Sequence, residues 1–297
     1  KETLRRALPK WSKADFADFE RLGYPVYWLS QDIASHIRQA KMVRANANLD
    51  HPLAIDCHVD RPRDVTEVTI YTSDHPGLFS GIAGAIALAG GNIVDARIFT
   101  LTNGMAMDAF SVQEVGDWVQ ESGGRVFDDA HRIKELERLI EATLTGAMRP
   151  REDLAKRSHI LPERSHVFTV PPQVHMDNTV SATNTVIEIN GRDRPGLLFE
   201  VTQALTDCSL QISTAKIATY GERAVDVFYV KDIFGLKVEN NSKIEQIREA
   251  LLRVLESYGK APTRPSRGKA EAPEKVQNRR QRKSRAKARS VRKTSAR

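Results

Sequence analysis

The chain has 297 residues, a net charge of +7 at pH 7 and two cysteines. This length suggests about two domains, each large enough to form a core without metal ions or disulfides. The most apolar run, residues 82–89, is far shorter than the roughly 20 residues of a membrane-spanning helix. Cys57 and Cys208 lack the spacing of a metal knuckle. We therefore expect a cytoplasmic protein with neither a membrane span nor a disulfide framework.

Residues 1–48 predict a short helical segment. Apolar residues recur at helical spacing over 12–22 and 30–43, and each stretch begins with a serine that can cap a helix. Between them lies the aromatic segment Tyr-Pro-Val-Tyr-Trp at 24–28. Such a segment more often packs against a neighbouring domain than binds a ligand, so we interpret it as a structural plug.

The chain then contains an internal repeat. The segment Asp-His-Pro-Gly-Leu at 74–78 recurs as Asp-Arg-Pro-Gly-Leu at 193–197, which is 119 residues later. The likeness extends further along the chain, where Asp-Ala-Phe at 108–110 matches Asp-Val-Phe at 226–228 after a slip of one residue. A chance match of a short peptide would not extend this far, which indicates two copies of one module.

Each copy predicts the order β-α-β-β-α. A β-rich run leads through the repeated loop into an apolar helical stretch, two strands follow, and an amphipathic helix comes last. In the first copy Asn103-Gly104 is a favoured hairpin turn between the two strands. This order is typical of an α+β fold made of two ferredoxin-like modules, which we place at 65–175 and 183–260, with 49–64 as a connector.

The position of the fourth strand of each module stays open. Residues 166–170 (His-Val-Phe-Thr-Val) are a plausible closing strand for the first copy. Nothing similar follows residue 258 in the second copy, and the strand candidate at 53–59 has no assigned partner. We expect that this candidate could supply a missing strand by exchange.

The repeated loop can bind an amino acid. Its glycine lets the backbone approach a ligand, and the N–H groups at the following helix start attract a carboxylate. The aspartate could accept the ammonium group, and polar residues at the next strand start could complete the contacts. The alternative is that the aspartate only caps the helix and Pro-Gly only forms the turn. The candidate effector-binding residues are Asp74, His75, Pro76, Gly77, Leu78, Asn92, Asp193, Arg194, Pro195, Gly196, Leu197 and Gln211.

Catalytic motifs are absent from the sequence. It contains no His-Glu-x-x-His, no His-Asp dipeptide, no Gly-x-Ser-x-Gly, no phosphate-binding Gly-x-x-x-x-Gly-Lys and no Gly-Ser loop followed by Asp-x-Asp. We therefore predict no catalytic residue and no metal ligand in this segment.

The C-terminal residues 261–297 carry most of the positive charge. They hold 14 Lys and Arg against two acidic residues, a charge of +12, which leaves −5 for residues 1–260. They contain three prolines and no Phe, Trp or Tyr, so we predict a disordered basic tail. A solubilising extension is favoured over nucleic-acid binding, because the tail lacks aromatic residues on which bases could stack.

Three segments together resemble a known family. They are Tyr-Pro-Val-Tyr-Trp-Leu-Ser at 24–30, Thr-Ser-Asp-His-Pro-Gly-Leu-Phe at 72–79 and Gly-Arg-Asp-Arg-Pro-Gly-Leu-Leu at 191–198. The two loops resemble those of tandem ACT domains, which are small amino-acid-sensing units. The whole of residues 1–260 is similar to the C-terminal region of the bifunctional uridylyltransferase/uridylyl-removing enzymes that act on the PII nitrogen-signalling protein.

The resemblance implies a regulatory function in nitrogen metabolism. In that family a Mg²⁺-dependent nucleotidyltransferase domain transfers UMP from UTP to PII, and a His-Asp domain with its own metal removes it. The paired ACT domains sense glutamine and switch between these activities. Both catalytic domains would lie upstream of Lys1, and residues 1–48 would be the linker from them. Which module binds the effector, and whether modules pair within or between chains, stays open.

Two other functions remain possible at this point. One is a free-standing ACT-repeat regulator that senses amino acids without an attached enzyme. The other is a nucleic-acid binder that uses its basic tail, which would give binding a steep dependence on salt.

Overall fold

The structure is a computed structural model, which describes residues 2–50, 52–115, 126–157, 171–221 and 223–256. The predicted closing strand at 166–170 and the predicted tail at 261–297 lie outside these ranges. No helix within the described ranges is long and apolar enough to cross a membrane.

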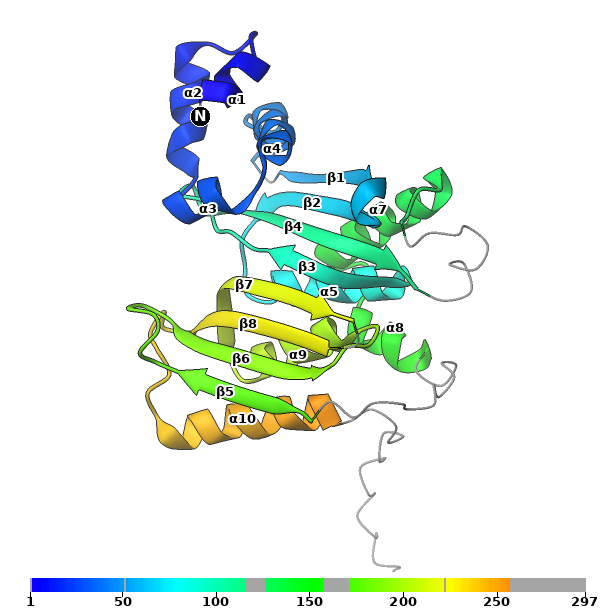
Figure 1. The fold of residues 1–297 in the computed structure, drawn as a ribbon, viewed down its shortest axis with the longest axis vertical. Helices are drawn as coiled ribbons and strands as arrows, with labels where there is room; N and C mark the ends of the chain where they lie inside the picture. Colours follow the sequence, from blue (N-terminus) through cyan, green and yellow to red (C-terminus); the bar gives the residue numbers. More distant parts are fainter. Residues whose placement is uncertain (1, 51, 116–125, 158–170, 222, 257–297) are drawn as a thin grey trace, which may run out of the picture. The chain divides into compact units, whose positions relative to one another are not determined.

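The described strands form one antiparallel sheet in the order β1-β2-β4-β3-β7-β8-β6-β5 (Figure 1). Each half of this sheet is one copy of the repeat, and the halves meet where β3 pairs with β7. The register there places Asp95 opposite Ala218 and Arg97 opposite Lys216. The strands are β1 Leu53–Asp60, β2 Val65–Ser73, β3 Gly91–Arg97, β4 Met105–Glu114, β5 Gln173–Asp177, β6 Thr185–Arg192, β7 Leu210–Tyr220 and β8 Arg223–Asp232.

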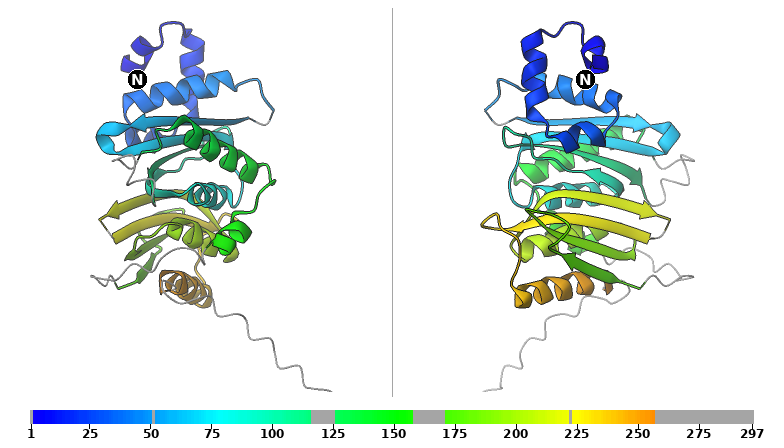
Figure 2. Two further views of the ribbon diagram at one scale, coloured as in Figure 1. Left: turned by 90° about the vertical axis from the view of Figure 1, so that its right-hand side faces the viewer. Right: turned by 60° about the vertical axis from the view of Figure 1, so that its left-hand side comes forward.

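Four helices cover one side of this sheet in the order α7, α5, α9, α10 (Figure 2). The helices of the two modules are α5 Leu78–Leu88, α7 Ala130–Leu144, α8 Pro150–Arg157, α9 Leu197–Asp207 and α10 Asn241–Glu256. The predicted α+β fold with two ferredoxin-like modules is therefore confirmed.

The two modules share one hydrophobic core. The ring of Phe79 lies 5.7 Å from that of Phe110 in its own module and 6.4 Å from that of Phe228 in the other. Gly84 allows α5 to approach its neighbours, because a Cβ there would lie 2.8 Å from Phe199 and 2.5 Å from Pro150. The modules are thus packed as one body and are not separate domains on a linker.

The fourth strand of each module precedes the repeat. In the first module β1 pairs with β2, from which it is separated by the short 3₁₀ turn Arg61–Arg63 and by Asp64 in the left-handed region. In the second module β5 pairs with β6. Two placements from the sequence therefore differ from the structure. Residues 53–60 lie in the segment assigned to a connector, and the strand candidate at 53–59 does form a strand there, but it pairs within its own module and not by exchange. The boundary at 175 falls within a strand of the second module. Both strands pair with the strand that follows them, because a short connection favours an antiparallel neighbour.

The N-terminal helices cover the other side of the first module. They are α1 Glu2–Ala7, α2 Lys13–Leu22, α3 Pro25–Ser30 and α4 Ile33–Ala45. Tyr27 packs with Tyr71 and Met107 of the sheet, and all three are buried. Arg38 of α4 forms an ion pair with Glu67 of β2, whose side chain is 6% exposed. These contacts agree with the interpretation of the aromatic segment as a structural plug.

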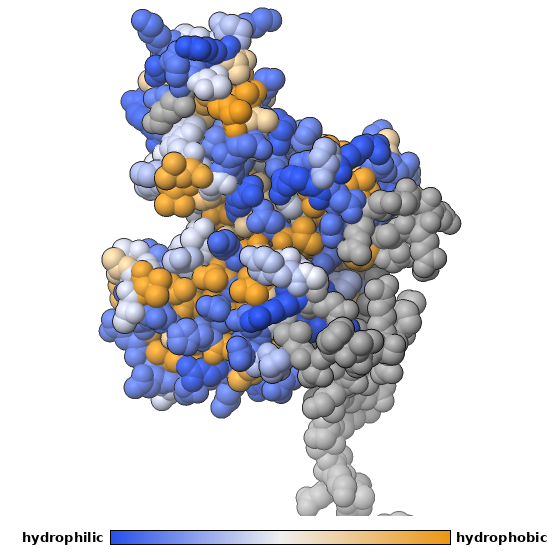
Figure 3. All heavy atoms as spheres, in the orientation of Figure 1, coloured by the Kyte–Doolittle hydropathy of each residue, from blue (hydrophilic) through white to orange (hydrophobic). Residues whose placement is uncertain are grey.

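The second module has no such cover among the described residues. In β4 of the first module Met107, Ala109 and Ser111 are buried, whereas Val225 and Val227 at similar positions of β8 are only half-buried. Figure 3 shows hydrophobic residues at the surface over this part of the second module. The two copies of the repeat thus have the same fold but different surroundings.

Candidate effector site between the two modules

The repeated loops are built around a glycine in the left-handed region. Gly77 has a φ of +83° and Gly196 a φ of +81°, and each is the N-cap of the following helix. Neither helix has a side-chain cap, so the first-turn N–H groups of α5 and α9 are not satisfied by a capping side chain. The alternative that the loop aspartates are helix caps therefore does not hold, and the helix starts are suited to a carboxylate.

Asp193 contacts the other module. Asn92, at the start of β3, donates a hydrogen bond from Nδ2 to Oδ2 of Asp193, with a distance of 2.8 Å. Burial raises the pKa of Asp193, and the hydrogen bond from Asn92 opposes this shift. The pairing of β3 with β7 therefore brings together two predicted residues that are 101 positions apart, and it places a carboxylate and an amide at one junction.

The Asp74 loop is arranged differently. Asp74 is exposed and accepts a hydrogen bond from Thr100 of its own module at 2.5 Å. Gln211 is half-buried at the start of β7, and the described contacts include no hydrogen bond between Gln211 and the Asp74 loop. The structure thus brings the predicted partners together at the second loop and not at the first.

The other loop residues have mainly structural contacts. Arg194 donates two hydrogen bonds to the carboxylate of Glu200, at 2.8 and 2.5 Å, and one to the carbonyl of Val254 at 3.2 Å. His75 is exposed, as are Pro76 and Pro195. Leu78 and Leu197 are buried and belong to the core, so they anchor the loops and do not face a ligand.

Two buried carboxyl groups near these loops were not among the predicted site residues. Asp108 is 1% exposed and accepts from the backbone N–H of Phe99, and Asp226 is 2% exposed and accepts from that of Ala218, both at 3.3 Å. Burial raises the pKa of both groups, to about 7 for Asp226, and the negative charge of the loop aspartate in each module adds to the shift. The sequence signal for Asp108 and Asp226 was a charged residue within an otherwise apolar strand.

The described residues contain no group of three or more His, Cys, Asp or Glu side chains that could hold a metal ion. What the site offers is hydrogen-bonding side chains, carboxylates and helix starts without a side-chain cap. This chemistry suits a zwitterion such as an amino acid better than it suits a hydrolytic or transfer reaction.

Comparisons with known proteins identify the type of domain and the family. Residues 180–257 match the model of the ACR family N-terminal ACT domain. The bifunctional uridylyltransferase/uridylyl-removing enzyme of Azospirillum brasilense is 53% identical over 247 residues, which is 82% of this chain and 26% of that protein. The enzymes of the same name from Rhodospirillum rubrum and Gluconobacter oxydans are 47% and 45% identical over 84% and 86% of this chain, and again 26% of each protein is covered.

The chain thus spans about a quarter of the length of these relatives. The identity extends over more than four-fifths of the chain, which confirms the resemblance found in the three sequence segments. The chain belongs to the family of the bifunctional uridylyltransferase/uridylyl-removing enzymes and corresponds to their C-terminal region, which contains ACT domains.

Proposed function

We propose that this chain is the glutamine-sensing regulatory region of such an enzyme, and that the effector binds where the Asp193–Leu197 loop meets Asn92. The observation that carries the proposal is the hydrogen bond from Asn92 to Asp193 across the junction of the modules. An amino acid bound there would direct its carboxylate to the start of α9 and its ammonium group to Asp193. Its contacts would then span both modules.

Regulation follows from that position. A ligand shifts an equilibrium between two states only when it binds one of them more tightly. A ligand that replaces the Asn92–Asp193 hydrogen bond depends on the spacing of the modules, so it would favour one arrangement of β3 and β7. In the parent enzyme this arrangement would select between UMP transfer to PII and removal of UMP. These reactions, and the Mg²⁺ and His-Asp metal they would need, are assigned to the rest of the parent enzyme.

The test uses thermal unfolding of the 297-residue chain with and without L-glutamine. Binding to the folded state stabilises it by about 2.7 kcal/mol when the ligand is at a hundred times its Kd. Unchanged melting with saturating glutamine, and with the other amino acids, would show that the chain is not an amino-acid sensor.

Two matched variants locate the effector. Gly77→Val and Gly196→Val place the same side chain at equivalent positions with φ near +80°, so they strain the two loops alike. We expect Gly196→Val to abolish the glutamine-induced stabilisation and Gly77→Val to retain it. The reverse result would assign the effector to the Asp74 loop.

A further inference from the structure

The second module has a sheet face that no described residue covers. Side chains alternate along β8, so Phe228 points into the core whereas Val225, Val227 and Tyr229 point to the opposite side. These three side chains are only half-buried. Figure 3 shows hydrophobic residues at the surface over this module. A surface with such an apolar centre is suited to an interaction with another protein surface.

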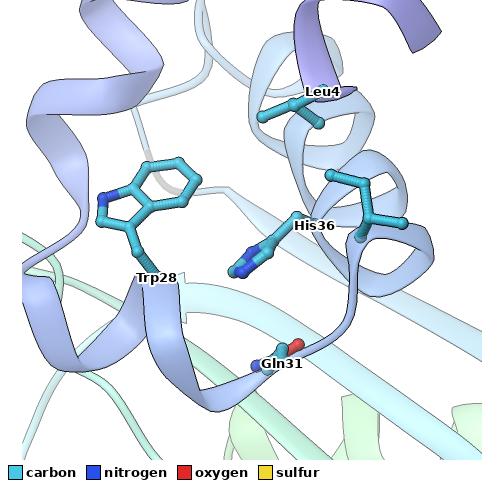
Figure 4. Close-up of a pocket in the computed structure, with 5 residues that line it drawn as sticks. Leu4, Trp28, Gln31 and His36 are labelled. Carbon is cyan, nitrogen blue, oxygen red and sulfur yellow. The ribbon is translucent and has the colours of Figure 1, made fainter. Parts of the chain in front are cut away.

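The same face of the first module shows how such a surface is covered. There Tyr27 packs with Tyr71 and Met107, and all three are buried. The covering helices also pack against one another, and the rings of Trp28 and His36 lie 5.1 Å apart beside a cavity of about 210 Å³ (Figure 4). These helices are already used by the first module, so a cover for the second module has to come from outside the described residues.

The charges on the open face differ between the two sides of β8. Lys216 of β7 and Glu188 of β6 both lie opposite Val227, one on each side of it, so the three side chains form a row on one face. Lys216 is exposed and has no ion pair among the described contacts, and its neighbour on β3 is a second cation, Arg97. Glu188 accepts a hydrogen bond from Asn190 at 2.9 Å and also has no described ion pair. Both ends of the row therefore lack an opposite charge.

We propose that this face binds the same face of a second copy of the chain, related to the first by a twofold axis along β8. This rotation places β7 of each copy over β6 of the other. Lys216 then meets Glu188 of the partner subunit, twice in each dimer, and Val227 packs on its own counterpart. A twofold axis across the strands would instead bring equal charges together, lysine on lysine and glutamate on glutamate. The charges therefore favour the axis along β8 over the axis across the strands.

The strand order is compatible with this arrangement. The first module lies on the β7 side of β8, and the sheet edge β5 lies on the other side. The rotation therefore carries the partner's first module beyond the β5 edge and away from the N-terminal helices of the first copy. Packed sheets lie about 10 Å apart and cross at roughly 30°. This crossing moves the ends of the two β8 strands apart, together with the cation Arg223 at the start of β8, so the contact is centred on Val227.

The size of the face sets the expected affinity. Four strands about 4.8 Å apart, with about five residues of roughly 3.3 Å each, give about 300 Å² of sheet. A standard stable interface buries roughly 800 Å² on each partner. We therefore expect a reversible dimer with a micromolar Kd.

Sedimentation equilibrium of the 297-residue chain, at an ionic strength of about 0.15 M, tests the proposal. We expect Lys216→Glu and Glu188→Lys each to weaken the dimer at least about tenfold, because each change creates two like-charge contacts in every dimer. Lys134→Glu is the matched control. It makes the same change of charge at an exposed position of α7, on the other side of the sheet, and it should leave the dimer unchanged.

A mixture of the two weakened variants is the most specific measurement. A mixed dimer of one Lys216→Glu chain and one Glu188→Lys chain again has two opposite-charge contacts, so we expect association to recover. Folding should survive Lys216→Glu, because the new carboxylate faces Arg97 within its own sheet. Thermal unfolding of each variant checks this before mixing. A wild-type chain that stays monomeric up to millimolar concentration, a dimer that neither reversal weakens, or a mixture that does not recover would overturn the proposal.

Discussion

Asp226 gives the sharpest prediction about the second module. Its side chain lies in the shared core, 2% exposed, where it accepts one hydrogen bond from the N–H of Ala218 and has no basic partner among the described ion pairs. Burial raises its pKa to about 7, and the charge of nearby Asp193 adds to this shift. Replacing Asp226 by Asn keeps an acceptor for Ala218 and removes the ionisable proton.

The sign of the effect follows from proton binding. An unfolded aspartate has a pKa near 3.9, so between about pH 4 and pH 7 the folded state binds this proton more tightly than the unfolded state does. The contribution of Asp226 to stability therefore falls as pH rises through that window and stays low above it. A difference of roughly three pKa units corresponds to about 4 kcal/mol.

We therefore expect Asp226→Asn to match the wild-type chain near pH 4 and to exceed its unfolding free energy by up to about 4 kcal/mol at pH 8. Urea unfolding of both proteins between these pH values measures the difference, in which titrating groups that do not interact with Asp226 cancel. Adding Asp193→Asn to both proteins should shrink the difference, because the neighbouring negative charge is gone. A difference that does not change with pH would refute the reasoning.

Two further predictions concern packing. Arg38→Met should lower the free energy of unfolding by about 3 kcal/mol, because it leaves the Glu67 carboxylate buried without its cation. Adding Glu67→Gln should recover much of this loss. Equal stability of Arg38→Met and the wild-type chain would contradict this prediction. Gly84→Ala should cost about 1–3 kcal/mol of unfolding free energy, because its Cβ would clash with Phe199. The control Gly81→Ala, whose Cβ would lie 3.4 Å from Cγ2 of Thr143, should be neutral or stabilise α5 by up to about 1 kcal/mol. Equal melting temperatures of the two variants would show that the close approach at Gly84 is not required.

The repeat made the fold predictable because it specifies the backbone. The glycines at 77 and 196 each need a left-handed conformation between a strand and a helix, and Asn103-Gly104 needs a tight turn. These local demands do not depend on partners far along the chain. The edge strands were harder to place, because a strand before the module and a strand after it can occupy the same edge with the same apolar pattern.

The candidate site was only partly predictable, because it depends on a pairing between strands that are far apart in the sequence. The contact between Asn92 and Asp193 exists because β3 pairs with β7, and no local pattern in either copy reports that pairing. The equivalent residues Asp74 and Gln211 have the same sequence context but are not joined. Arg194 has the residue type of a ligand contact, yet its guanidinium is held by Glu200.

The two modules therefore have different contacts although they share one sequence pattern. The second module supplies the loop with Asp193, and the first supplies Asn92 on β3 and also carries the N-terminal helices on β2 and β4 through Tyr27 and Glu67. The β3–β7 pairing is the shortest among the described strand pairs, with three residue pairs, so the fewest residue pairs of the sheet lie at the junction of the two modules. Under the proposed function, a ligand at the Asp193 loop would act on this pairing, and the first module would connect it to the helices that precede the repeat. In this proposal a tandem of two modules provides what a single copy lacks, because one module would hold the ligand while the other is fixed to the N-terminal segment.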